Sequence, residues 1–151
     1  MRSLRYLSAA FLLLALAGAS HATDFKVVVL DSKNGHALRG KLVCINLPPD
    51  DPNAPVVEHV RACQRTDSGG VAVFALTDPV PVTVDVSLAS DGLMPCFTPH
   101  TFAVSDAMKT GTVSKNTCGG AATDTTETGE VVVFAHQKSL REAMSSVSNE
   151  F

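Results

Sequence analysis

The sequence predicts an all-β domain, a seven-stranded antiparallel sandwich followed by a short C-terminal helix. Three observations predict this class. Segments rich in β-branched residues recur at short intervals between Thr23 and His136, turns containing Gly, Pro, Asn or Asp separate them, and no helical pattern lies between consecutive strands. Parallel α/β sheets need a crossover helix between strands, so this pattern excludes them and favours two packed antiparallel sheets.

Residues 1–22 have the pattern of a cleaved export signal. Arg2 and Arg5 precede an apolar or small run of 11 residues, Ala9–Ala19, and 20–22 (Ser-His-Ala) place small residues where a signal peptidase reads the chain. A membrane-spanning helix needs about 20 apolar residues, so an anchor is disfavoured. We therefore expect an exported protein, periplasmic or secreted, with no membrane span in the mature chain.

The mature chain from residue 23 is mildly acidic. It keeps 10 of the 12 basic residues and all 15 acidic ones, which gives a net charge of -5. This charge offers no electrostatic footprint for nucleic acid, and 45% hydrophobic residues over the full 151-residue chain argue against intrinsic disorder. We expect one domain over residues 23–136, with 137–151 forming the C-terminal helix or tail.

All four cysteines, Cys44, Cys63, Cys96 and Cys118, lie in the mature part. An even number after an export signal predicts two disulfides, for which three connectivities are open. We favour Cys44 with Cys63 and Cys96 with Cys118, because each pair closes a loop of about 20 residues, worth roughly 3 kcal/mol in the chain-entropy model. A zinc site is disfavoured because no C-x2-C spacing occurs.

The first two strands are predicted at Phe25–Leu30 and Lys41–Leu47. The first is rich in β-branched residues and runs into the turn 31–35, whose Asn-Gly pair supplies the positive φ angles of a tight turn. The second is apolar on both faces, which indicates a central strand covered on both sides. It stops at the loop Pro48–Pro55, which holds four prolines in eight residues.

Four further strands are predicted. Val57–Arg65 and Val71–Leu76 flank the turn 66–70 and are expected to form a hairpin with each other. In Val82–Leu88 valine and leucine alternate with polar residues, which predicts one buried and one wet face. A short strand around Phe102 and Val104 follows.

The last predicted strand is Val131–His136, and a Gly- and Thr-rich loop, Cys118–Gly129, precedes it. After it the period becomes helical, and Ser139 with Glu142 forms a capping box. The helix would dock its apolar stripe on the sandwich or present it to a partner, whereas its low positive charge disfavours a membrane surface. The stripe comprises Leu140, Ala143, Met144, Val147 and Phe151.

The order of these motifs resembles the carboxypeptidase regulatory-like domain of the transthyretin-like, or prealbumin-like, superfamily. The resemblance covers Phe25–Leu88, about half of the mature chain, and implies an immunoglobulin-like β-sandwich. Beyond it, the chain looks like small exported bacterial proteins of unknown function, so the resemblance implies a fold and no activity. Its marks are the turn 31–35, Leu38-Arg39-Gly40, Thr66-Asp67 with Gly69 or Gly70 before Val73-Phe74, and the valine-alternating strand.

The sequence predicts no catalytic, cofactor-binding or metal-binding residues and therefore no enzyme. Within the superfamily, hydroxyisourate hydrolases end in Tyr-Arg-Gly-Ser and intradiol dioxygenases use two tyrosines, whereas the single tyrosine here, Tyr6, lies in the leader. No G-x-S-x-G elbow is present. His36, His59, His100 and His136 are too widely spaced for a local metal motif, but a metal or hydrolytic site assembled across strands stays open as an alternative.

Binding signals are sparse. The mature chain has no Trp or Tyr to form a sugar-binding platform, and Phe97 is expected to pack inside. Neither Asp50, Asp51 and Asn53 nor Asp124 and Glu127 match a calcium loop.

The expected function is that of an exported non-catalytic module. It would bind another envelope protein or a cell-surface polymer through the loop Pro48–Pro55, the loop Cys118–Gly129 or the C-terminal helix, because rigid sandwiches present recognition loops. A purely structural envelope component is the remaining alternative. The oligomeric state stays open.

Overall fold

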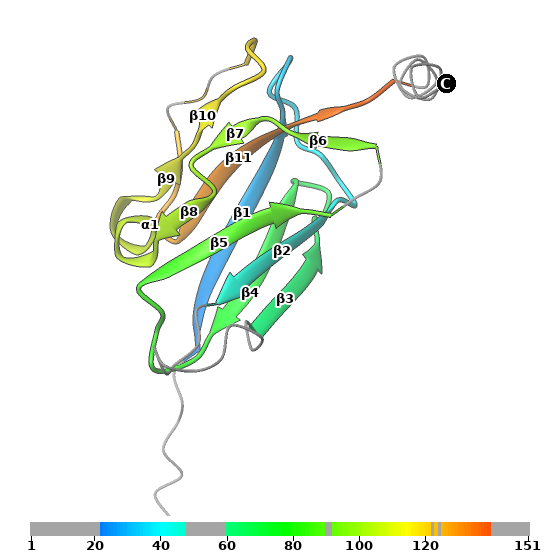
Figure 1. Cartoon of the computed structure of the whole chain (residues 1–151). Coiled ribbons are helices and arrows are strands. Elements are labelled where there is room, and N and C mark those ends of the chain that lie inside the picture. Colours follow the sequence, from blue (N-terminus) through cyan, green and yellow to red (C-terminus); the bar gives the residue numbers. More distant parts are fainter. Residues whose placement is uncertain (1–21, 48–59, 90–91, 122, 124, 140–151) are drawn as a thin grey trace, which may run out of the picture.

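The computed structural model describes residues 22–47, 60–89, 92–121, 123 and 125–139, which form two β-sheets packed face to face (Figure 1). The first sheet has the order β4 (Val71–Leu76), β1 (Thr23–Asp31), β11 (Glu130–Gln137) and β6 (Leu93–Pro95), and β9 (Thr112–Val113) also pairs with β11. The second has the order β3 (Val60–Arg65), β2 (Leu42–Leu47), β5 (Thr83–Leu88) and β8 (Thr101–Ala103). A separate ribbon pairs β7 (Phe97–Thr98) with β10 (Lys115–Asn116), and α1 (Val104–Thr110) follows β8. The all-β sandwich class is confirmed.

The main core lies between the two sheets and is built by alternate residues of each strand. Each buried Val, Ile or Phe side chain contributes about 1.5–3 kcal/mol relative to an exposed one. The largest fully buried members are Phe25, Val27 and Val29 of β1, Val43 and Ile45 of β2, Leu76 of β4, Val84 and Val86 of β5, and Val131 and Val133 of β11.

The first sheet is mixed, so the expectation of a purely antiparallel sandwich is wrong. β1 and β11 pair in parallel, with Val27 opposite Val131 and Val29 opposite Val133. No crossover helix is needed, because the whole second sheet lies in the chain between these two strands. The run 131–135 of β11 is buried on both faces, as parallel strands usually are.

The described residues hold eleven strands where seven were expected. The additional ones are β6, β7, β9 and β10, which are only two or three residues long. Segments this short carry no readable period, so the sequence pattern missed them.

The expected hairpin between the third and fourth strands is also wrong. β3 pairs with β2 and β4 pairs with β1, so the two lie in opposite sheets. Thr66 holds the start of the connection. Its backbone N–H donates to the carbonyl of Lys41 (2.9 Å), and its hydroxyl donates to the carbonyl of Leu38 (2.6 Å). These bonds tie the residue after β3 to the segment before β2, at the point where the chain crosses to β4 in the other sheet.

Two local patterns turn out largely as predicted. The turn after β1 places Gly35 at φ 73°, while Asn34 keeps a negative φ. In the alternating segment Val84 and Val86 are buried, but Val82 precedes β5 and is 81% exposed. The alternation of buried and exposed residues therefore begins inside β5, at Val84.

The predicted strand at Phe102–Val104 ends one residue early, because Val104 begins α1. Val104 and Ala107 face inward at helical spacing, and Gly111, at φ 75°, ends the helix by donating its N–H to the carbonyl of Ala107 (2.9 Å). At seven residues the helix is too short to show in the sequence period.

Several predicted features lie wholly or mostly outside the described residues. They are the export signal 1–22 (of which only Ala22 is described), the loop Pro48–Pro55, and the C-terminal helix beyond Ser139. In the part of the chain that is described, no helix has the length and apolar character to cross a membrane.

Both disulfides have the favoured pairing. Cys44 and Cys63 lie directly opposite each other on β2 and β3, and Cys96, between β6 and β7, bonds to Cys118 after β10. No cysteine is free. Cys44 and Cys96 are fully buried, whereas Cys63 and Cys118 are exposed.

Candidate binding pocket

A second, smaller apolar cluster lies on the outer face of the first sheet, the face turned away from the main core. Leu30 of β1 lies opposite Phe134 of β11 on this face, and Val28 lies opposite Val132. Residues 112–121, which include β9 and β10, run beside these positions. We call this group the outer cluster: Cys96, Val132 and Phe134 are buried, and Val28, Leu30 and Val113 pack against them.

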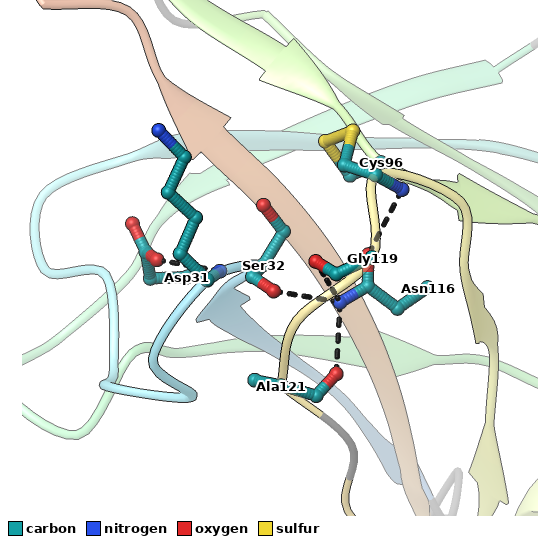
Figure 2. Close-up of a disulfide and its surroundings, with 8 residues drawn as sticks. Asp31, Ser32, Cys96, Asn116, Gly119 and Ala121 are labelled. Carbon is teal, nitrogen blue, oxygen red and sulfur yellow. Dashed lines mark hydrogen bonds between the residues drawn. A yellow bond between two sulfur atoms is a disulfide. The ribbon is translucent and has the colours of Figure 1, made fainter.

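Asn116 at the end of β10 organises the loop that follows (Figure 2). Its side-chain Nδ2 donates to the carbonyls of Ser32 (2.8 Å) and Ala121 (2.8 Å), with a longer contact to that of Gly119 (3.3 Å). Its Oδ1 accepts the backbone N–H of Cys118 (3.1 Å). One side chain therefore holds both ends of the loop 116–121 and fastens it to the turn after β1.

Three further ties fix the same loop. Ala121 donates its N–H to the carbonyl of Ser32 and Thr117 donates to that of Cys96, both at 2.8 Å, and the disulfide holds Cys118. Gly120 lies so close to Ser32 that a Cβ would come within 2.7 Å of that residue's carbonyl oxygen. Only glycine fits there, because its φ of 101° also disfavours any side chain.

The loop borders an open cavity of about 650 Å³. This volume falls within the range of about 300–1,000 Å³ that is common for ligand sites. Its lining mixes apolar and polar groups, and among the described residues that line it Lys115 alone is charged. The lining comprises Val113, Ser114, Lys115, Asn116, Gly119, Gly120, Ala121, Thr123 and Phe134.

Of the two predicted recognition loops, the one at Cys118–Gly129 supplies part of this cavity. The other loop, Pro48–Pro55, lies outside the described residues, as do the candidate calcium ligands within it and Asp124. Glu127 is described, and its N–H donates to the carboxylate of Glu130 (3.1 Å).

Sequence reasoning missed the roles of Asn116 and Phe134. An Asn followed by Cys118 and two glycines was the available signal, because Asn side chains bond the backbone two residues on and glycine permits the turn. The partner turn at Ser32 is 84 residues away, so that contact had no local signature.

A second groove of about 330 Å³ lies along β5 and β8 and brings Asp85, Ser87, His100 and Thr101 together. The Ser87 hydroxyl donates to a backbone carbonyl of β2 (3.4 Å), and the Thr101 hydroxyl donates to Asp85 (2.6 Å). The His100 ring meets the Phe97 ring edge-on, with centroids 4.7 Å apart. No hydrogen bond joins His100 to Ser87 or Asp85, so the groove assembles no nucleophile and base pair.

The other candidates separate in space. His59 lies outside the described residues, and His36, His100 and His136 come from different parts of the fold. Across the described ranges, no three His, Cys, Asp or Glu side chains gather closely enough to hold a metal ion. Phe97 is 3% exposed and stacks on Phe102, so it is a packed residue as predicted and offers no sugar platform.

Comparison with protein-family models, curated proteins and solved structures found no match. The fold and the site define the class instead, a disulfide-bonded all-β sandwich with a preformed surface pocket on the outer face of one sheet. The resemblance to carboxypeptidase regulatory-like domains stays a prediction.

Proposed function

We propose that this protein is an exported, non-catalytic module that binds another envelope protein or a cell-surface polymer through the cavity beside residues 113–121. The observation that carries the proposal is the fixed loop around that cavity. A disulfide and the amide of Asn116 hold the loop, and Gly120 lies close against Ser32.

The contacts that hold this loop are not needed to form the main core. None of residues 112–121 belongs to the core between the sheets, which the strands, Phe97, Phe102 and α1 complete. A preformed wall lowers the cost of binding, because each flexible side chain or loop that must be ordered costs about 0.5–1.5 kcal/mol. Rigid scaffolds that carry exposed loops are also the usual place of recognition.

Export is supported by the covalent framework. Two disulfides that use all four cysteines are typical of an oxidising compartment, and the predicted leader at 1–22 would deliver the chain there. The non-catalytic part of the proposal is supported by the second groove, where the Ser87 hydroxyl is directed to a backbone carbonyl rather than to His100.

The test is affinity capture from an envelope extract with the mature chain, residues 23–151, followed by mass spectrometry. Gly119→Asn is the test variant, because Gly119 borders the cavity at φ 74° with open space around its Cα, and Asn tolerates this backbone. Gly40→Asn is the matched control, since Gly40 has φ 72°, equally open space and no place in the lining.

We expect the wild-type chain and Gly40→Asn to recover the same saturable partner, and Gly119→Asn to recover much less of it. Equal unfolding midpoints of the two variants would establish that both are folded. Capture of nothing above background, or equal capture by both variants, would overturn the proposal.

A further inference from the structure

The described lining of the cavity carries a charge opposite to that of the protein. Residues 23–151 carry a net charge of -5, yet Lys115 is the single charged residue among the described lining residues. The nearby carboxylate of Asp31 (Figure 2) is engaged in its own turn, where it accepts the N–H groups of Lys33 (2.8 Å) and Asn34 (3.2 Å). Lys115 therefore offers an anion in the cavity a cationic partner.

The polar groups left open at the cavity include hydrogen-bond donors. Within the described part of the chain, the backbone N–H groups of Gly119 and Gly120 have no acceptor, and both residues have left-handed φ angles of 74° and 101°. Successive amides beside left-handed residues form concavities that bind anions and capture terminal carboxylates.

Two further observations favour an anion at the cavity. The carbonyls of Ser32, Gly119 and Ala121, which would repel an anion, already accept the Asn116 amide. The hydroxyl of Ser114, another lining residue, is buried and has no partner among the described residues. Buried polar groups are usually paired, so this hydroxyl also lacks an acceptor.

Part of the lining is apolar. Val113 and Phe134 of the outer cluster border the cavity, together with Ala121. Phe134 is already buried, so an apolar group beside the anion would bury its surface against the partly exposed Val113 and Ala121.

We propose that the cavity binds a carboxylate attached to an apolar group, with the carboxylate at Lys115 and the Gly119 and Gly120 amides and the apolar group against Val113 and Ala121. This rests on the proposed function and specifies the chemistry that its partner presents. A protein partner would present this carboxylate as its C-terminus, and a free short-chain carboxylic acid carries the same chemistry.

The test is an NMR titration of the 15N-labelled mature chain with three probes. They are N-acetyl-Val-Leu with a free carboxyl terminus, the same dipeptide with a C-terminal amide, and hexanoate. We expect the free acid dipeptide to shift the Gly119 and Gly120 amide signals saturably and the amidated dipeptide to bind at least about tenfold more weakly. If hexanoate binds as tightly as the acid dipeptide, a carboxylate on an apolar chain is sufficient for binding. If hexanoate binds more weakly, the site recognises the peptide C-terminus.

Lys115→Gln should weaken binding of the acid dipeptide about fivefold, which corresponds to an exposed ion pair worth about 1 kcal/mol. Lys109→Gln is the control, because Lys109 is an exposed lysine in the last turn of α1 outside the lining. Equal binding of the acid and the amide would overturn the carboxylate assignment while leaving the binding function intact. Failure of both acids to shift Gly119 and Gly120 would also overturn it, whereas the capture experiment tests the function separately.

Discussion

Replacing Asn116 with alanine is the sharpest single perturbation of the loop. It removes the two short hydrogen bonds from Nδ2 to the carbonyls of Ser32 and Ala121, both part-buried at 2.8 Å, and the acceptor of the Cys118 N–H. Each such bond contributes about 1 kcal/mol net, and the exposed contact to Gly119 adds little. We expect Asn116→Ala to lower the free energy of unfolding by about 2–3 kcal/mol.

Urea denaturation monitored by circular dichroism measures this loss of unfolding free energy. Asn34→Ala is the matched control, because the Asn34 side chain makes one exposed hydrogen bond, to the N–H of His36 (2.8 Å), and its removal should cost under about 1 kcal/mol. If Asn116→Ala and Asn34→Ala destabilise the protein equally, Asn116 does not organise the loop and the reasoning is refuted.

Three further predictions follow from packing and the covalent framework. Gly120→Ala should cost about 2 kcal/mol or more in the same assay, because its Cβ would meet a backbone carbonyl at 2.7 Å, and a cost near zero would mean that the loop is not held there. Ile45→Ala should cost about 2–5 kcal/mol and Val82→Ala under about 0.5 kcal/mol, since Ile45 is fully buried and Val82 is 81% exposed; similar costs would contradict the assigned core. The double variant Cys96→Ala with Cys118→Ala should lose roughly 3 kcal/mol but keep the far-ultraviolet strand spectrum, because Cys96 packs in the outer cluster and not in the main core, and loss of that spectrum would contradict this separation.

The fold class could be predicted because its signal is local. The β-branched runs at Phe25–Leu30 and Val71–Leu76 and the alternation of Val84 and Val86 each report a strand independently of the rest of the chain. The pairing partners could not be predicted in the same way. β3 pairs with β2 and β4 pairs with β1, while Thr66 between them bonds to the segment before β2, and a turn motif does not show which sheet the next strand joins.

The site was only partly readable from the sequence. The even cysteine count predicted two disulfides, the short loops between neighbouring cysteines favoured the observed pairing, and the Gly- and Thr-rich composition marked the loop after Cys118. Asn116, however, acts on Ser32 at the other end of the domain sequence, and Phe134 reads as an ordinary strand residue. Such long-range contacts become visible only when β1 and β11 are placed side by side.

Amide hydrogen exchange on the free mature chain tests the central idea, that the loop is formed before any ligand binds. The N–H groups of Ala121 and Thr117 bond to the carbonyls of Ser32 and Cys96, whereas those of Gly119 and Gly120 have no acceptor among the described residues. The structure predicts that Ala121 and Thr117 exchange at least about 100-fold more slowly than the two glycines, in keeping with loop opening that costs about 3 kcal/mol. Equally fast exchange at all four amides would contradict a preformed pocket.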